Sequence, residues 1–475
     1  MNNRFEDAEW RESMRIKLDV NNMFADKVGA EHGYSEEDVA AMQEKVSKAH
    51  EKLQEERPGF MDLPENHKEI AQEIKEFAQE NRADYDNFVV LGIGGSALGN
   101  IALQTALNHP YYNLNDESRE DCPRLFTPDN VDPTRLKGLL ETLDLENTIF
   151  NVISKSGGTA ETMSQFLTAR GAVVEELGAE AVSDHFIATT SEDSGNLIKI
   201  AQQEDIPTFY IPDDVGGRFS VLTPVGLVSS AFVGIDVEEL LAGAGYMAKL
   251  CNTDDLWSNP AYLNSVLQYL ADQDGKSMSV MMPYAHSLKD MADWYRQLWA
   301  ESLGKKFDRE DNLVNVGPTP IKALGATDQH SQVQLYIAGP YDKVVTFMEV
   351  ENYGKELEIA PGYEDISGVS YLGGHTFNEL IKAEKKATEL ALTKNNRLNC
   401  TVKFPEINAF TVGQFIYMFE LQTALSGELY DINAFNQPGV EQGKNYTYGI
   451  LGREGYDDMK EEFEARPTKD DDLIL

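Results

Sequence analysis

Residues 154–162, here called the hydroxyl loop, form the segment whose composition is best suited to holding a phosphate group. The loop reads Ser-Lys-Ser-Gly-Gly-Thr-Ala-Glu-Thr and lies where an apolar, strand-like run passes into a helix-like run. Free backbone N–H groups at the start of a helix, combined with hydroxyl side chains, make a neutral site for a monophosphate. Helix capping by Thr159 is the competing explanation, but capping needs one hydroxyl residue and this loop contains four. The Gly-Lys-Ser/Thr order of a P-loop is absent, so a monophosphate site is the favoured interpretation.

A second glycine-rich loop, residues 92–99, has the spacing of a dinucleotide-binding fingerprint. It reads Gly-Ile-Gly-Gly-Ser-Ala-Leu-Gly, follows a strand-like run and opens a helix-like run. The fingerprint also needs an acidic residue at the end of a second strand, roughly 20 residues further on. Asp116 stands at about that distance, but in a polar stretch. Dinucleotide binding is therefore the weaker interpretation, and we expect no cofactor.

The elements that must position these loops alternate along the chain. Strands that alternate with helices of ten or more residues predict a parallel sheet. In the first half we expect strands at 87–93, 148–153, 185–189 and 207–211, and helices at 97–107 and 159–177. In the second half we expect strands at 277–282, 343–348 and 400–404, and helices at 291–302, 377–394 and 410–426.

Recurrence of this pattern after about residue 236 predicts two α/β units, each large enough for its own doubly wound sheet. We expect an N-terminal helical extension at 1–60, a first α/β domain at 61–235, a second at 236–440 and a C-terminal helical tail at 441–475. The helices of the N-terminal extension are expected to lie on a core rather than to form one. No low-complexity linker separates the two units, so we expect a shared interface, where small-molecule sites are frequent.

Composition argues against several classes of partner. The 475 residues carry a formal net charge of −39, from 80 acidic and 41 basic side chains. Such a surface repels nucleic acid and anionic membranes, so neither is an expected partner. The three cysteines, Cys122, Cys251 and Cys400, are scattered and the N-terminus lacks an apolar signal run, which predicts a cytoplasmic protein. The eight histidines form no visible metal-ligand cluster, so no metal site is expected.

Two long segments resemble the two diagnostic signatures of the glucose-6-phosphate isomerase family. Residues 213–226 read Asp-Asp-Val-Gly-Gly-Arg-Phe-Ser-Val-Leu-Thr-Pro-Val-Gly. Residues 427–444 read Gly-Glu-Leu-Tyr-Asp-Ile-Asn-Ala-Phe-Asn-Gln-Pro-Gly-Val-Glu-Gln-Gly-Lys. Both glycine-containing loops, residues 297–301 and the segment around His330 resemble further landmarks of the family in the same order. The similarity therefore spans roughly residues 85 to 450.

This resemblance implies two sugar-isomerase domains of flavodoxin-like topology and a homodimer. It also implies an aldose-ketose isomerase of glycolysis and gluconeogenesis that interconverts glucose 6-phosphate and fructose 6-phosphate. The reaction moves a proton between adjacent carbons through an enediol(ate) and needs a base, a group that stabilises the oxyanion, and help with ring opening. Gly158 departs from the family, which usually carries threonine there, so the set of phosphate donors stays open.

The resemblance assigns four residues to catalysis. Glu301 matches the catalytic base, and Arg218 matches the arginine that stabilises the enediolate. His330 and Lys444 match the residues of ring opening, and in the family this histidine reaches the site from the other subunit. As single residues, a helical glutamate is more often solvated and a lone arginine or histidine more often structural. The substrate-binding residues that the family match implies are Gly95, Ser96, Ser154, Lys155, Ser156, Thr159, Thr162, Gln297 and Gln437.

Three other functions remain open from the sequence. A relaxed isomerase would also accept mannose 6-phosphate, and the shape of the pocket would decide this. A non-catalytic sugar-phosphate sensor would need the hydroxyl loop but not Glu301, His330 and Lys444 together, so their joint presence argues against it. A dehydrogenase is the weakest interpretation, and a test of nicotinamide binding would settle it.

Overall fold

The first sheet is parallel throughout, with strand order β3-β2-β4-β5-β6. The computed structural model describes residues 3–475. The strands are β2 Asn87–Leu91, β3 Arg124–Phe126, β4 Thr148–Ile153, β5 Phe186–Thr190 and β6 Thr208–Tyr210. The first of these strands in the chain lies between the second and the third, which is the flavodoxin-like order. Its switch point falls between β2 and β4, so the glycine-rich loop and the hydroxyl loop leave the sheet side by side.

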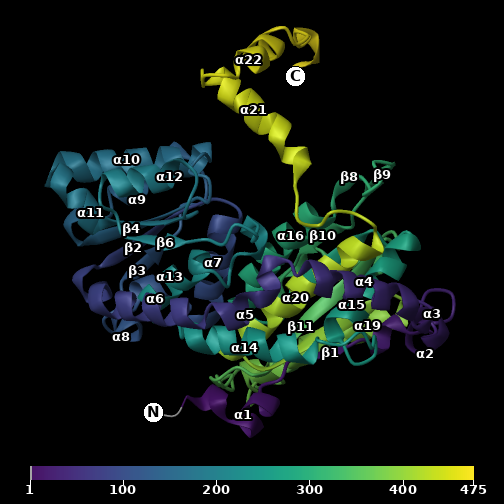
Figure 1. Cartoon of the computed structure of the whole chain (residues 1–475). Helices are drawn as coiled ribbons and strands as arrows, with labels where there is room; N and C mark the ends of the chain where they lie inside the picture. Colours follow the sequence, from purple (N-terminus) through teal and green to yellow (C-terminus); the bar gives the residue numbers. More distant parts are fainter. Residues whose placement is uncertain (1–2) are drawn as a thin grey trace.

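Helices cover both faces of this sheet (Figure 1). Successive strand residues point to opposite faces, so Phe88 and Val90 belong to one buried cluster and Val89 and Leu91 to another. The cluster of Phe88 and Val90 includes residues of α6 Lys68–Asn81, α7 Gly95–Leu107 and α13 Pro224–Phe232. The cluster of Val89 and Leu91 includes residues of α10 Ala160–Leu177, α11 Val182–His185 and α12 Asn196–Gln203, with α9 Pro133–Leu140 packed against it. The short helix α8 is Asp116–Arg119.

The second sheet has the order β1-β12-β11-β7-β10. Its strands are β7 Met278–Pro283, β10 Thr319–Lys322, β11 Lys343–Asn352, β12 Asn399–Glu406 and β1 Lys17–Asp19. The four strands β7, β10, β11 and β12 are parallel and repeat the flavodoxin-like order. Its helices are α14 Val237–Leu250, α15 Pro260–Gln273, α16 Lys289–Leu303, α17 Val333–Ala338, α18 Ser367–Ser370, α19 Phe377–Lys394 and α20 Ala409–Leu429. A separate hairpin pairs β8 Lys305–Phe307 with β9 Leu313–Val316. The predicted α/β class with parallel sheets is confirmed.

The N-terminal segment differs from its prediction in two respects. It contains the expected helices, which are α1 Ala8–Ser13, α2 Ala25–Val28, α3 Glu36–Ala40 and α4 Gln43–Glu56; α5 Leu63–Asn66 follows beyond residue 60. It also contains β1, which pairs antiparallel with β12 at the edge of the second sheet. In addition, Met23, Val39 and Leu53 are fully buried in the main hydrophobic cluster. The segment therefore forms part of the core, because its buried apolar residues join the cluster of the second sheet and its helices.

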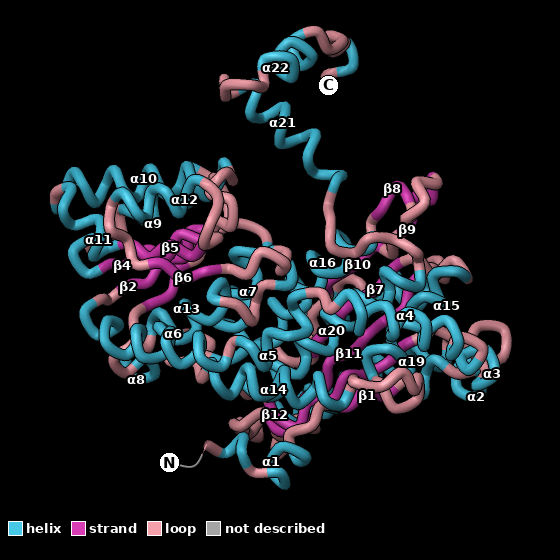
Figure 2. The backbone as a smooth tube through the Cα atoms, viewed as in Figure 1, coloured by secondary structure: helices cyan, strands magenta, loops and turns pink. Residues whose placement is uncertain are grey.

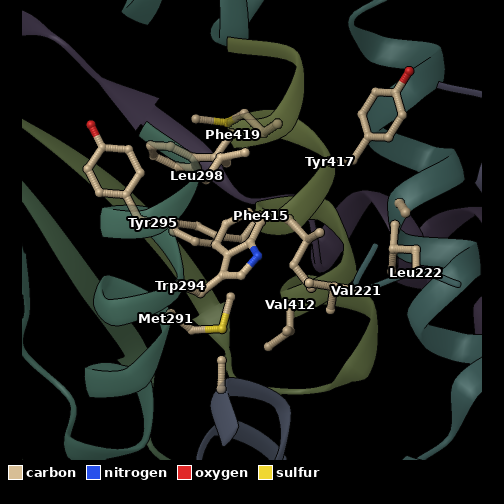
Figure 3. Packing of buried hydrophobic residues seen from close by; sticks show 14 of the residues in the cluster. Val221, Leu222, Met291, Trp294, Tyr295, Leu298, Val412, Phe415, Tyr417 and Phe419 are labelled. Carbon is tan, nitrogen blue, oxygen red and sulfur yellow. The ribbon is translucent and has the colours of Figure 1, made fainter. Parts of the chain in front are cut away.

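The two α/β units meet along α7, α16 and α20. One buried cluster runs from Phe88 in the first sheet to Phe404 in the second. Figure 3 shows its centre, where Trp294 of α16 lies against Phe415 of α20, with 6.2 Å between the ring centroids. Thr105 of α7 donates a hydrogen bond of 2.6 Å to Asp290 of α16. The expected interface between the units is thus continuous apolar packing, which fixes α16 against the loops of the first sheet.

The C-terminal residues 441–475, here called the arm, project away from both units (Figure 1). The arm contains α21 Glu441–Ile450 and α22 Asp457–Glu464, which pack against each other. Figure 2 shows the loop connection that leads from α20 to the arm. Among residues 3–475, no helix has the length and apolar character needed to cross a membrane.

Candidate active site

A buried arginine facing a carboxylate is the centre of the candidate site. Arg218 lies in the short 3-10 helix η8 Gly217–Phe219, and its side chain is 2% exposed. Its Nη1 lies 3.5 Å from Oε2 of Glu301, which is on the last turn of α16 and is 27% exposed. Burial lowers the pKa of the Arg218 guanidinium, and the nearby Glu301 opposes that effect. The arrangement places a fixed positive charge beside an accessible carboxylate.

Four further acceptors fix the plane of the Arg218 guanidinium. Its Nε donates to Ser302 Oγ at 2.7 Å, and Nη1 donates to Gln437 Oε1 at 3.1 Å. Nη2 donates to the carbonyl oxygens of Ala434 at 2.5 Å and Asn436 at 3.2 Å. Residues 434–437 belong to the second signature-like segment, and Arg218 to the first. The structure therefore brings the two segments into direct contact, although they are far apart in the chain.

The glycines of the first loop allow a close approach of three segments. A Cβ at Gly95 would lie 2.3 Å from the backbone carbonyl of Gly217, so only glycine fits there. Gly94 has a φ of +55°, and a Cβ there would lie 3.1 Å from Nε2 of Gln297. Gln297 lies one turn before Glu301 on α16, and its Nε2 donates a hydrogen bond of 3.3 Å to Glu301 Oε2. The structure thus brings Gln297, Glu301, Arg218 and Gly95 together. Gly95 begins α7, and Ser96 is the second residue of that helix.

The hydroxyl loop is shaped by its glycines and its own hydroxyl groups. Gly157 has a φ of +58°, and a Cβ there would lie 2.1 Å from the backbone nitrogen of Leu197. The N–H of Gly157 donates to Ser154 Oγ at 3.0 Å, and the N–H of Gly158 donates to Ser156 Oγ at 3.1 Å. Within the described residues, the hydroxyl of Thr162 is buried without a hydrogen-bond partner. Thr159 takes the N-cap position of α10, but its side chain forms no capping bond, which leaves the first N–H groups of that helix for a ligand.

Lys155 connects the hydroxyl loop to the segment that carries Arg218. Its Nζ donates to the carbonyl oxygens of Asp213 at 2.5 Å and Val215 at 3.2 Å. Burial lowers the pKa of Lys155 below its ordinary value, against the pull of Asp213 and Asp214. The ammonium group therefore holds two loops together, a role that the sequence alone did not indicate.

Lys305 and Ser302 are site residues that the sequence analysis missed. Nζ of Lys305 donates to the carbonyl oxygens of Glu301 and Ser302, each at 2.7 Å, and so caps the C-terminus of α16. Burial lowers the pKa of Lys305 to about 8, and the charge of Arg218 adds to this effect. A lysine just beyond the last turn of the predicted helix was the available signal. Ser302 gave no signal, since its hydroxyl matters only through Arg218.

His330 and Lys444 lie apart from this cluster in the single chain. His330 is exposed at the end of the 3-10 helix η10 Thr327–His330. Lys444 lies on α21 of the arm, where its Nζ is 3.0 Å from Glu441 Oε1. Within residues 3–475, neither side chain forms a hydrogen bond or ion pair with Glu301 or Arg218. Their roles in catalysis remain predictions.

One cavity lies away from these residues. It has a volume of about 660 Å³ and is lined by residues of β1, the following turn, Trp257 and Lys403. None of the predicted site residues lines it. We place the candidate site at Arg218 and Glu301 instead, because convergent charged and amide groups, rather than volume, define a site for a small anion.

Comparison with known proteins gives a consistent result. A family model described as phosphoglucose isomerase matches residues 12–469. A glucose-6-phosphate isomerase from Carboxydothermus hydrogenoformans is 49% identical over 94% of this chain and 97% of its own length. A glucose-6-phosphate isomerase from Rubrobacter xylanophilus is 42% identical over 92% of this chain and 99% of its own. The chain is thus similar over nearly its whole length to sugar-phosphate isomerases.

Solved structures agree with this. A hypothetical protein from Thermus thermophilus has a TM-score of 0.82 at 34% identity, covering 92% of this chain and 100% of that one. A glucose-6-phosphate isomerase from Chlamydia trachomatis has a TM-score of 0.71 at 25% identity, covering 84% of this chain and 76% of that one. This chain belongs to the phosphoglucose isomerase family.

Proposed function

We propose that this chain is a glucose-6-phosphate isomerase, which interconverts glucose 6-phosphate and fructose 6-phosphate. The observation that carries the proposal is the buried guanidinium of Arg218 held 3.5 Å from the carboxylate of Glu301. A fixed cation beside an accessible carboxylate is what proton abstraction next to a carbonyl requires. Family membership over residues 12–469 supports the same reaction.

In the proposed mechanism Glu301 is the base. It removes the proton from C2 of the open-chain aldose and returns it to C1, while one hydroxyl proton passes from O2 to O1. The enediolate that forms between these steps carries negative charge on oxygen. Arg218 stabilises that charge, and its rigid set of acceptors means that it need not reorganise during the reaction.

The remaining site residues bind and open the sugar. Ser154, Ser156, Thr159 and Thr162 hold the phosphate group with the N–H groups at the start of α10, and the glycine-rich loop at Gly95 and Ser96 closes the site beside them. Gln297 and Gln437 bind the sugar hydroxyls, and both already contact the cluster of Glu301 and Arg218. Lys155 acts by fixing the phosphate-binding loop. Lys444 assists ring opening.

The chain acts as a homodimer in this proposal, with His330 contributed to ring opening across the interface. The exposure of His330 supports this, since a catalytic histidine that forms no hydrogen bond or ion pair with Glu301 or Arg218 needs another chain to bring it to a site. Exposed apolar residues on the β8–β9 hairpin and on α17, namely Phe307, Leu313 and Leu335, offer contact surface for a second copy. We place the enzyme in the cytoplasm, where its three free, buried cysteines would stay reduced.

The test is the conversion of fructose 6-phosphate to glucose 6-phosphate in the presence of a chelator, for the wild type and for Glu301→Gln. Loss of a positioned base should lower kcat at least about 100-fold. A variant that retains activity would remove Glu301 from the mechanism. A wild-type protein that binds fructose 6-phosphate but does not convert it would refute the enzyme and favour a sensor.

A further inference from the structure

The arm contacts the rest of the chain through one tyrosine. The hydroxyl of Tyr448 donates a hydrogen bond of 3.1 Å to the carbonyl oxygen of Gly158. Within residues 3–475 this is the only side-chain hydrogen bond or ion pair that joins the arm to the two α/β units. Its acceptor lies in the hydroxyl loop, between Ser156 and the N-cap residue Thr159. An otherwise projecting element is thus attached to the loop assigned to the phosphate group.

The ring of Tyr448 is held firmly by the arm itself. The guanidinium of Arg453 lies over the ring, 4.4 Å from its centroid. The ring of Tyr456 packs edge-on against it with centroids 5.1 Å apart. The N–H of Arg453 also donates to the carbonyl of Tyr448 at 2.9 Å, which closes the end of α21. The hydroxyl of Tyr448 is therefore held in a fixed position on the arm. A movement of the hydroxyl loop would then move α21 as a rigid body.

Helical spacing links this contact to Lys444. Residues four apart lie on the same face of a helix, so Lys444 lies one turn from Tyr448 on the side of α21 that faces the hydroxyl loop. In this structure Nζ of Lys444 rests on Glu441, a local and exposed partner. A Cβ at position 158 would meet only Ser156 Oγ, at 3.4 Å, so the Tyr448 contact does not depend on glycine at this position.

On the basis of the proposed function, we propose that Tyr448 is a positioning residue that couples the phosphate-binding loop to the placement of Lys444. Tyr448 touches no reacting atom. Phosphate bound in the hydroxyl loop orders the Gly158 peptide group, and Tyr448 then fixes the rotation of α21 so that Lys444 is directed at the sugar ring. Without the hydroxyl of Tyr448, phosphate would still bind, but α21 would no longer be held against the loop.

The test compares Tyr448→Phe with Tyr446→Phe, which removes a hydroxyl from the same helix. The hydroxyl of Tyr446 bonds to Glu462 within the arm, at 2.7 Å, so Tyr446→Phe is the matched control. A neutral hydrogen bond contributes a factor of about 5. We expect Tyr448→Phe to lower kcat by about 5-fold with KM changed less than twofold, and Tyr446→Phe to change neither by more than about twofold. A Tyr448→Phe enzyme with the kinetics of the wild type would overturn the proposal.

A second comparison asks whether Tyr448 acts through Lys444. In a Lys444→Met background, Tyr448→Phe should have no further effect on kcat, because the group it positions is gone. The same 5-fold loss in that background would exclude the coupling. Hydrogen exchange of α21, measured with inorganic phosphate present, should be about 5-fold faster in Tyr448→Phe than in Tyr446→Phe, and equal rates would contradict the contact. A wild-type protein without isomerase activity would instead refute the proposed function, and the exchange measurement would still decide the contact.

Discussion

The ammonium group of Lys305 is bonded to the main chain of Glu301 itself, through a hydrogen bond of 2.7 Å to its carbonyl oxygen. A second bond of the same length goes to Ser302, whose hydroxyl orients Arg218. One side chain thus supports both the proposed base and the group that aligns the proposed oxyanion-stabilising arginine. Replacing Lys305 should therefore disturb the positions of both Glu301 and Arg218.

Replacing Lys305 should damage catalysis more than binding. Lys305→Met removes a charged donor from two carbonyl groups, and we expect kcat to fall about 10-fold or more. Lys305→Arg, which keeps a positive charge and several donors, should retain more activity than Lys305→Met. Steady-state kinetics with fructose 6-phosphate test this, and equal losses in the two variants would argue that only the shape of lysine matters.

The pH dependence of kcat/KM should also reflect the charge of Lys305. Because the pKa of Lys305 is lowered to about 8, it loses its charge in alkaline solution, whereas an arginine stays protonated. Arg218 and Glu301 are the charged groups that act on the Lys305 ammonium. In the β8–β9 hairpin, Lys305 lies opposite Val316, which carries no charge. We expect kcat/KM of the wild type to fall above about pH 8 and the Lys305→Arg profile to stay flat further into the alkaline range. If the wild type and Lys305→Arg have the same pH profile, the loss of activity at alkaline pH belongs to a group other than Lys305.

Ser302→Ala should disturb Arg218 without unfolding the protein. The Nε–H of Arg218 would lose its 2.7 Å acceptor inside a buried site, and an unsatisfied buried donor costs about 1–3 kcal/mol. We expect kcat/KM to fall about 10-fold while the thermal transition shifts by only a few degrees. Ser118→Ala, at an exposed position on α8, serves as the control. Full activity in Ser302→Ala would mean that the other four contacts suffice to hold Arg218.

Gly95→Ala should be far more harmful than an alanine at an open glycine. The new methyl group would lie 2.3 Å from the backbone of Gly217, and relief of that clash would displace η8 and with it Arg218. We expect kcat/KM to fall at least about 100-fold or the protein not to fold, and circular dichroism distinguishes these. A methyl group added at Gly138 would meet nothing within 4 Å, so Gly138→Ala should behave as the wild type. Normal activity in Gly95→Ala would show that the two loops can separate.

Glu420 should make the protein less stable in alkaline than in acidic solution. Both carboxyl oxygens are buried without a hydrogen-bond partner among the described residues, and burial raises the pKa of this group well above its ordinary value. The native state then holds a proton that the unfolded chain has lost, so this contribution to stability is complete below the unfolded pKa and declines as pH rises. We expect Glu420→Gln to melt a few degrees higher than the wild type at pH 8 and much closer to it at pH 5.

The control for this prediction is Glu55→Gln, because Glu55 is exposed on α4. Calorimetric scans at one fixed rate compare the three proteins at both pH values. Identical pH dependence in the wild type and Glu420→Gln would show that Glu420 is ionised, or that it finds a partner in solution.

The sequence predicted the central strands and helices because their periodicity is local. The helix predicted at 377–394 has those bounds in the structure, and the strand predicted at 148–153 is β4. The strands β1, β3, β8, β9 and β10 were missed, and each has only three or four residues, too few to show a periodic pattern. The helix α13 was missed because all nine of its residues are buried, which removes the polar face that periodicity relies on.

The candidate site was predictable only where a residue matches a landmark of the family. Glu301, Arg218 and Gln297 were identified by resemblance, and they lie together. Lys305, Ser302 and Tyr448 were not, because each acts through a backbone carbonyl or a second side chain that only the fold brings near. Gly95 was identified as a substrate-binding residue, and its contact with Gly217 gives it a packing role as well.

The pairing of β1 with β12 has a consequence for the order in which the chain can fold during synthesis. Lys17 lies opposite Lys403, so an early strand and a late one are neighbours at the sheet edge. The strands β2 to β6 are complete by residue 210, and their sheet can assemble while the ribosome is still making the second half. The N-terminal segment must wait for most of translation before its partner strand emerges, and during that interval its apolar residues have no finished surface to cover.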